Sequence, residues 1–143
     1  MKGFKKVKEG AIRPKRATKG SAGYDFYALE TVRINPMSVA IIPTGVATDG
    51  MKSSEVLILS LRSSVSVNRP VLMTSGVGVI DSDYEATGQD ISIMLFNRHP
   101  NIPVTIEKGE RIAQGVIYKY ITVDDEKPPT AKRTGGTGST GTK

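Results

Sequence analysis

The sequence contains no cysteine and no tryptophan, and it has one histidine, His99. Without thiols there are no disulfides and no thiolate metal sites, which is compatible with a reducing cytosol. A single histidine gives little support to a histidine metal cluster or to a Ser-His-Asp triad. No apolar run approaches the ~20 residues of a membrane span, and none follows the basic N-terminus as in a signal peptide. We therefore expect a soluble, cytoplasmic protein without a membrane segment.

Positive charge is scarce in the middle of the chain, although the net charge is +6. Residues 1–19 carry +7 and residues 127–143 carry +4, whereas residues 20–126 carry −5. A nucleic-acid-binding domain usually carries its basic residues on the folded surface, often beside aromatic residues, and aromatic residues make up only 6% of this chain. We expect no direct binding of nucleic acid. The basic ends either solubilise the protein or contact an anionic ligand.

What the sequence does contain is a series of short apolar runs between turn residues, without the spacing of an amphipathic helix. A chain of 143 residues has the size of one domain. The pattern predicts an all-β fold, an antiparallel barrel or sandwich. Besides an early strand around Asp25, the expected strands cover residues 32–34, 38–42, 55–61, 71–73, 77–80, 91–96, 104–106 and 112–123.

Two segments depart from this pattern. Residues 63–68 could form a helix, but Ser, Val and Asn favour one only weakly. From residue 128 onward Gly, Thr and Lys replace the apolar residues, so this tail cannot offset the entropy of its own ordering. We expect a β domain over residues 1–127 and a flexible C-terminal arm over residues 128–143 that orders only on a partner.

The segment GVIDSDY, from Gly78 to Tyr84, places two carboxylates and a phenol directly after an apparently buried strand. Asp is disfavoured inside strands, and a buried carboxylate needs a partner. The segment is therefore either a polar turn at the end of a strand or part of a functional site.

Other polar segments also allow a structural and a functional interpretation. The segment Arg62-Ser63-Ser64 is either a turn or a phosphate cradle of one guanidinium and two hydroxyls. The tail GGTGSTG is either a linker or a loop whose backbone approaches a polyphosphate closely. Asp25 either bonds to backbone or holds a water of hydrated Mg²⁺. Gln114 either belongs to an ordinary strand or donates to an anionic oxygen.

The order of the motifs is more specific than any one of them: AGYDFYA, RSS, GVIDSDY followed by LFN, KGERIAQ and GGTGSTG. In this order and at these spacings, from Ser21 to Gly141, the chain closely resembles the trimeric dUTPases. The resemblance implies a jelly-roll-like β domain that forms a homotrimer, with active sites built from more than one subunit and closed by the C-terminal arm. It also implies hydrolysis of dUTP to dUMP and pyrophosphate, for nucleotide-pool sanitation and for the dUMP supply of dTMP synthesis.

The resemblance further implies a role for each matching residue. Asp81 would be the general base that activates water, and Asp25 would orient a water on the cofactor Mg²⁺. Tyr84 would pack under the deoxyribose, where a ribose 2'-hydroxyl does not fit. Asp83 receives no role. The remaining substrate contacts would be Ser75, Gly78, Val79 and Ile80 for uracil, Arg62, Ser63, Ser64 and Gln114 for phosphates, and Lys132, Arg133, Thr137, Gly138 and Ser139 in the arm.

The chain departs from the family at several of these positions. Ser64 stands where the family usually has Gly, Ser75 where it has Asn, and Thr137 where an aromatic residue stacks on uracil, which should weaken or alter closure of the arm. Strict spacing puts Lys132 at the place of the arm arginine, with Arg133 one residue late. After Tyr84 the stretch EATGQD is longer than the usual hairpin of the family.

Two alternatives remain at this point. A dCTP deaminase relative shares the fold and the RSS segment, but it needs a Glu where this chain has Met94, so deamination would lack its proton carrier. A non-enzymatic module, either a dUTPase-like protein in which nucleotide occupancy controls a regulatory protein partner or a capsid-like jelly roll, would leave the polar motifs without a catalytic task.

Overall fold

The structure is a computed structural model that describes residues 1–136, 138 and 140–142. Strands dominate it, so the predicted all-β fold is confirmed. The elements are β1 (Gly3–Lys6), β2 (Tyr24–Tyr27), β3 (Val32–Ile34), β4 (Val39–Pro43), β5 (Val46–Asp49), β6 (Glu55–Leu61), α1 (Ser63–Asn68), β7 (Val71–Met73), β8 (Gly78–Asp81), the 3-10 helix η1 (Ser82–Thr87), β9 (Ser92–Asn97), β10 (Val104–Ile106) and β11 (Arg111–Lys119).

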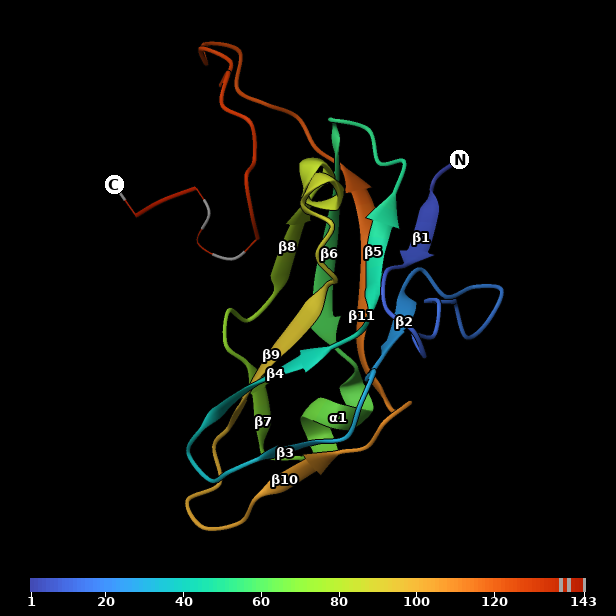
Figure 1. The fold of residues 1–143 in the computed structure, drawn as a ribbon, viewed down its shortest axis with the longest axis vertical. Coiled ribbons are helices and arrows are strands. Elements are labelled where there is room, and N and C mark those ends of the chain that lie inside the picture. Colours follow the sequence, from blue (N-terminus) through green and yellow to red (C-terminus); the bar gives the residue numbers. More distant parts are fainter. Residues whose placement is uncertain (137, 139, 143) are drawn as a thin grey trace.

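The largest sheet has the strand order β2-β11-β6-β8, and every neighbouring pair in it is antiparallel. A second sheet has the order β4-β9-β7, and β1 with β5 and β3 with β10 form two-stranded pairs. Figure 1 shows β6, β8 and β11 along the long axis of the molecule, with β3, β10 and α1 at its lower end. The long strand β6 therefore connects the two ends of the protein.

Residues from both larger sheets form the hydrophobic core. In β6 and β9 every second side chain is buried, as expected for strands with one face on the core. Leu57, Leu59, Ile93 and Leu95 are completely or almost completely buried. Gly115 of β11 crosses this layer, and a Cβ at this position would lie 2.8 Å from Leu57 and 2.9 Å from Leu59. The close approach of β11 to the core thus requires a glycine.

The observed elements differ from the expected ones in several places. Asp81 is the last residue of β8 and does not follow the strand, and β11 ends at Lys119, before the expected end at residue 123. The strands β1 and β5 are not among those expected. The helix α1 forms despite its weak propensity, because Val65 is buried and its amide donates to the Arg62 carbonyl at 3.0 Å.

Beyond β11 the chain carries no helix or strand between residues 120 and 136, and the predicted domain boundary at residue 127 lies within this segment. Neither helix in the described part of the chain is long and apolar enough to cross a membrane.

Candidate active site

The predicted site residues gather at the two ends of β6. Asp81 is the cross-strand partner of Val56, near the first end of β6, whereas Arg62 directly follows its last residue. Val56 and Arg62 are six residues apart along the chain, which corresponds to about 20 Å in a strand. We call the first group the hairpin end, formed by β8, η1 and the arm, and the second the arginine end, formed by Asp25, Arg62, Arg111 and Gln114.

A cavity of about 810 Å³ opens at the hairpin end. Its walls come from β8, η1, β9 and residues 7 and 8, and the arm covers one side. Figure 1 shows the arm leaving the upper end of β11 and descending beside β8. Most of the residues predicted from the hairpin and the arm line this cavity together, namely Ser75, Gly78, Val79, Ile80, Asp81, Tyr84, Arg133 and Gly138. Thr137 and Ser139 lie outside the described residues.

Asp81 presents its carboxylate at the mouth of this cavity, where its side chain is 53% exposed. Its partner is Arg133 of the arm, whose terminal nitrogen lies 2.5 Å from Asp81 Oδ2 and whose Nε lies 2.7 Å from Asp83 Oδ1. The hydrogen bond to Asp83 raises the pKa of the Arg133 guanidinium above its ordinary value. Lys132 is exposed and does not line the cavity, so the later of the two basic arm residues faces the site.

Tyr84 forms part of the cavity wall and is held by its hydroxyl, which donates to the backbone carbonyl of Asp90 at 3.1 Å. Burial raises the pKa of the phenol, so Tyr84 is neutral and presents a ring edge or face to a ligand. The Asp90 carboxylate in turn accepts hydrogen bonds from the backbone amides of Thr44 and Gly45 and pairs with Lys8 at 2.8 Å. The wall is therefore fixed to the β4–β5 turn and to the N-terminal segment.

Three of the positions predicted to contact uracil lie on β8. Gly78, Val79 and Ile80 pair with β6, so one edge of β8 is used in the sheet and the other edge borders the cavity. Ser75 donates to the Val77 carbonyl at 2.7 Å and thereby shapes the turn before β8. In this arrangement, backbone groups between apolar walls are available to a ligand.

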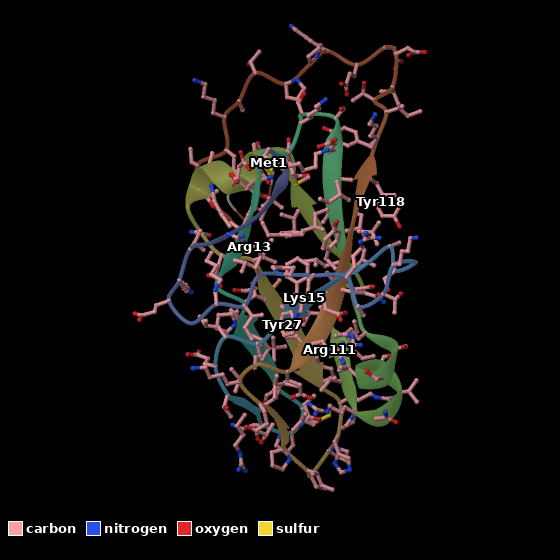
Figure 2. All side chains as sticks on the ribbon, turned by 90° about the vertical axis from the view of Figure 1, so that its right-hand side faces the viewer. Met1, Arg13, Lys15, Tyr27, Arg111 and Tyr118 are labelled. Carbon is pink, nitrogen blue, oxygen red and sulfur yellow. The ribbon has the colours of Figure 1, made fainter. Side chains whose placement is uncertain are left out.

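The arginine end is organised around Asp25, which is 6% exposed. Asp25 Oδ1 forms an ion pair with Arg62, whose Nε lies 3.0 Å away, and Asp25 Oδ2 accepts a hydrogen bond from Arg111 at 3.2 Å. Gln114 is the cross-strand partner of Asp25. The absence of a side chain at Gly23 leaves the space that the Gln114 side chain occupies. Figure 2 shows Arg111 at the lower end of β11 beside Tyr27, with Tyr118 far above it.

A second cavity of about 340 Å³ lies at the arginine end, lined by Arg62, Ser64, Val65, Asn68, Arg69, Glu110 and Arg111. Ser63 starts α1 and is exposed, but it does not line this cavity. Sequence reasoning missed Arg111 and Arg69 as part of this cluster. For Arg111 a signal existed, because it lies in the same motif as Gln114.

Asp25 is also the residue that would meet Mg²⁺. Among the described residues no group of three His, Cys, Asp or Glu side chains is placed to hold a metal ion. Both Asp25 oxygens are already paired with guanidinium groups, so direct coordination would displace an arginine. Mg²⁺ commonly keeps several of its waters. If the ion arrives bound to phosphates, one of these waters can still donate a hydrogen bond to a remaining lone pair of the Asp25 carboxylate. The donor set therefore fits a hydrated ion held mainly by its ligand.

An all-β fold with an accessible carboxylate beside a deep pocket, and with a guanidinium cluster at the other end, has the parts of a nucleotide hydrolase. The chain belongs to the dUTPase family of dUTP diphosphatases, whose family model matches residues 9–141.

Curated relatives and solved structures agree with this. The chain is 40% identical to the deoxyuridine 5'-triphosphate nucleotidohydrolase of Lactococcus lactis, over 99% of this chain and 98% of the relative, and 37% identical to that of Treponema denticola, over 99% of each. The crystal structure of the Streptococcus mutans dUTPase has a TM-score of 0.78 and 33% identity, over 85% of this chain and 98% of that one. A Staphylococcus phage 80alpha dUTPase mutant with dUpNHpp has a TM-score of 0.77 and 28% identity, over 90% and 96%. The predicted family and jelly-roll-like fold are confirmed.

Proposed function

We propose that the protein is a cytoplasmic, homotrimeric enzyme that hydrolyses dUTP to dUMP and pyrophosphate, with Asp81 as general base. The observation that carries the proposal is that Asp81, Tyr84, residues of β8 and described residues of the arm line a common cavity. In this reaction a water attacks the α-phosphorus and gives a proton to the Asp81 carboxylate. The bond from the α-phosphorus to the oxygen bridging to the β-phosphorus breaks, and pyrophosphate leaves.

The two ends of β6 divide the substrate between them. The hairpin end supplies backbone groups for the uracil edge and the Tyr84 ring for the deoxyribose. The arginine end supplies Arg62, with Ser63, Ser64 and Gln114, for the phosphates. Mg²⁺ bound with the triphosphate would neutralise charge that builds on the leaving pyrophosphate. Asp25 would hold that ion through a water and keep Arg62 oriented.

Within one chain, Asp81 and Arg62 lie toward opposite ends of β6, about 20 Å of strand apart. A symmetric assembly can bring the two groups together, since the hairpin end of one subunit can meet the arginine end of the next. The sheet β4-β9-β7 offers a surface for such contacts. Val39, Ile41 and Leu72 are 50–62% exposed on it, and pairing with Phe96 and Met94 puts them on one apolar face. We propose that subunits pack through this face.

The experiment that tests the function is pyrophosphate release by the purified protein with Mg²⁺. We expect rapid release from dUTP and little from dTTP, dCTP or UTP. The variant Asp81→Asn should lower kcat by about 10²–10⁴ and still bind dUTP, because only the proton acceptor is lost. Asp49→Asn, which removes an exposed acid on β5, is the matched control and should keep full activity. Absence of release from dUTP by the unaltered protein would refute the proposal.

A regulatory role is the second candidate function. The similar phage 80alpha dUTPases are described as controlling the transfer of virulence genes by a G protein-like mechanism. In this chain the stretch EATGQD after Tyr84 runs beside the cavity, and Ala86, Gly88 and Gln89 in it are exposed. If this surface binds a regulatory protein, a partner should co-purify with the chain and be released by dUTP. If the same partner proteins co-purify with a variant in which the loop after Thr87 is shortened, this role is contradicted.

A further inference from the structure

Asp83 is the one acid of the GVIDSDY segment that the reaction does not use. Its carboxylate is about as exposed as that of Asp81, at 55% against 53%, but Asp83 does not line the cavity. Its partner Arg133 does line the cavity and is only 14% exposed. Asp83 therefore contacts the arm from outside the space that a nucleotide would occupy.

Different nitrogen atoms of the Arg133 guanidinium contact the two acids, Asp81 and Asp83. Its Nε edge faces Asp83 at 2.7 Å, and a terminal nitrogen faces Asp81 at 2.5 Å. Arginine has five N–H donors, so further donors remain for another acceptor. The terminal nitrogen contacts Asp81, which itself borders the cavity.

The arm is also fixed at a second point. Gly136 packs against Gln89 and Tyr84, and a Cβ at position 136 would collide with the Gln89 side chain and lie 3.3 Å from the Tyr84 ring. In this position of the arm Arg133 contacts the carboxylate of the proposed base.

We propose that Asp83 is a positioning residue that keeps Arg133 at the cavity while its terminal nitrogen exchanges Asp81 for a phosphate oxygen of the substrate. A guanidinium binds phosphate strongly and in a fixed orientation, so the exchange frees Asp81 to accept a proton from water. The Nε contact to Asp83 is kept throughout, and the arm need not leave the pocket. This inference rests on the proposed role of Asp81 as base.

Two measurements on Asp83→Asn test the inference. The first is the rate at which trypsin cuts after Lys132 and Arg133 without nucleotide, followed by mass spectrometry of the released peptide. We expect cleavage about two- to fivefold faster than in the unaltered chain, because one of the two partners of Arg133 has lost its charge. Glu85→Gln is the matched control, since this acid of η1 accepts from the Gly50 amide instead of the arm and should leave the rate unchanged.

The second measurement is a double-mutant cycle on the KM for dUTP. Asp83→Asn alone should raise KM by about two- to fivefold with a smaller change in kcat, and Asp83→Glu should restore most of the loss. In an Arg133→Gln background Asp83→Asn should have no further effect, because Asp83 acts through Arg133. An equal rise of KM in both backgrounds, or unchanged cleavage of the arm, would overturn the inference. If the chain did not hydrolyse dUTP at all, the proposed function would fail while the cleavage result still reported on the Asp83 contact.

Discussion

The hairpin end and the arginine end belong to the same strand, yet they are built on different physical principles. The hairpin end offers backbone groups, apolar walls and one half-exposed carboxylate, and its charge contact comes from a tail without regular structure. At the arginine end a buried carboxylate already orients two guanidinium groups. Recognition of a base depends on shape and hydrogen-bonding edges, whereas recognition of phosphates depends on charges whose orientation is fixed in advance.

The strongest way to test this division is to inactivate each end in a different chain. In the proposed homotrimer, the variants Asp81→Asn and Arg62→Gln should each be nearly inactive on their own. After the two variants are unfolded together and refolded as a 1:1 mixture, about one quarter of the sites should combine an intact hairpin end with an intact arginine end from a neighbour. Pyrophosphate release from dUTP should therefore reappear on mixing.

The control for this experiment is simple mixing of the folded variants, which should recover activity only as fast as subunits exchange. If the refolded mixture stays as inactive as the separate variants, both ends of one site come from the same chain, and the division between subunits is wrong.

A smaller effect should follow from removing the centre of the arginine end. Asp25→Asn leaves two guanidinium groups without their anion and should lower the free energy of unfolding by about 1–3 kcal/mol. It should also raise KM for dUTP, because Arg62 loses its orientation, while the affinity for deoxyuridine, which lacks phosphates, stays unchanged. Urea unfolding and calorimetric binding measure these effects. Asp49→Asn serves as control, and a parallel loss of deoxyuridine binding would show that the two ends are not independent.

The smallest expected effect concerns acid stability at the hairpin end. Glu55 starts β6 and is 2% exposed. A hydrogen bond from Lys2, supported by one from the Lys52 amide, lowers the pKa of Glu55 below its ordinary 4.5. Its stabilising contribution is thus fully present above pH 4.5 and is lost as the pH falls through the folded-state pKa.

Glu55→Gln should therefore flatten the loss of stability below pH 4.5, as measured by urea unfolding at a series of pH values. Glu30→Gln, which changes an exposed acid, should leave the fall of the unfolding free energy at acid pH as steep as in the unaltered chain. Equal curves for Glu55→Gln and the unaltered chain would show that the Lys2 contact does not contribute to stability.

The sequence predicted those parts of the fold in which one face is buried. The strands β6 and β9 alternate strictly, and both were expected. β5 was missed because Val46, Ala47 and Thr48 are all buried, so it shows no alternation, and β1 was missed because it has only Phe4 to bury. The helix α1 depends on tertiary contacts that local propensity does not reveal.

The sequence predicted the site residues that lie within the ordered motifs. The contact between Arg111 and Asp25 depends on an irregularity in the β2–β11 register between Arg111 and Ala113, which a residue pattern does not reveal. The partner of Asp83 could not be found either, because it depends on where the arm lies. In both cases a charged residue acquires its role from a segment distant in sequence.

Asp90 has a practical consequence for work with this protein. The backbone carbonyl of Asp90 accepts from the Tyr84 hydroxyl, and its carboxylate pairs with Lys8. Residues 7 and 8 themselves line the cavity. Residues 7 and 8 thus form part of the wall of the proposed substrate pocket. Changes at residues 7 and 8 would alter this wall, whereas the exposed β9–β10 turn near Asn101 does not line the cavity and offers a safer place for a label.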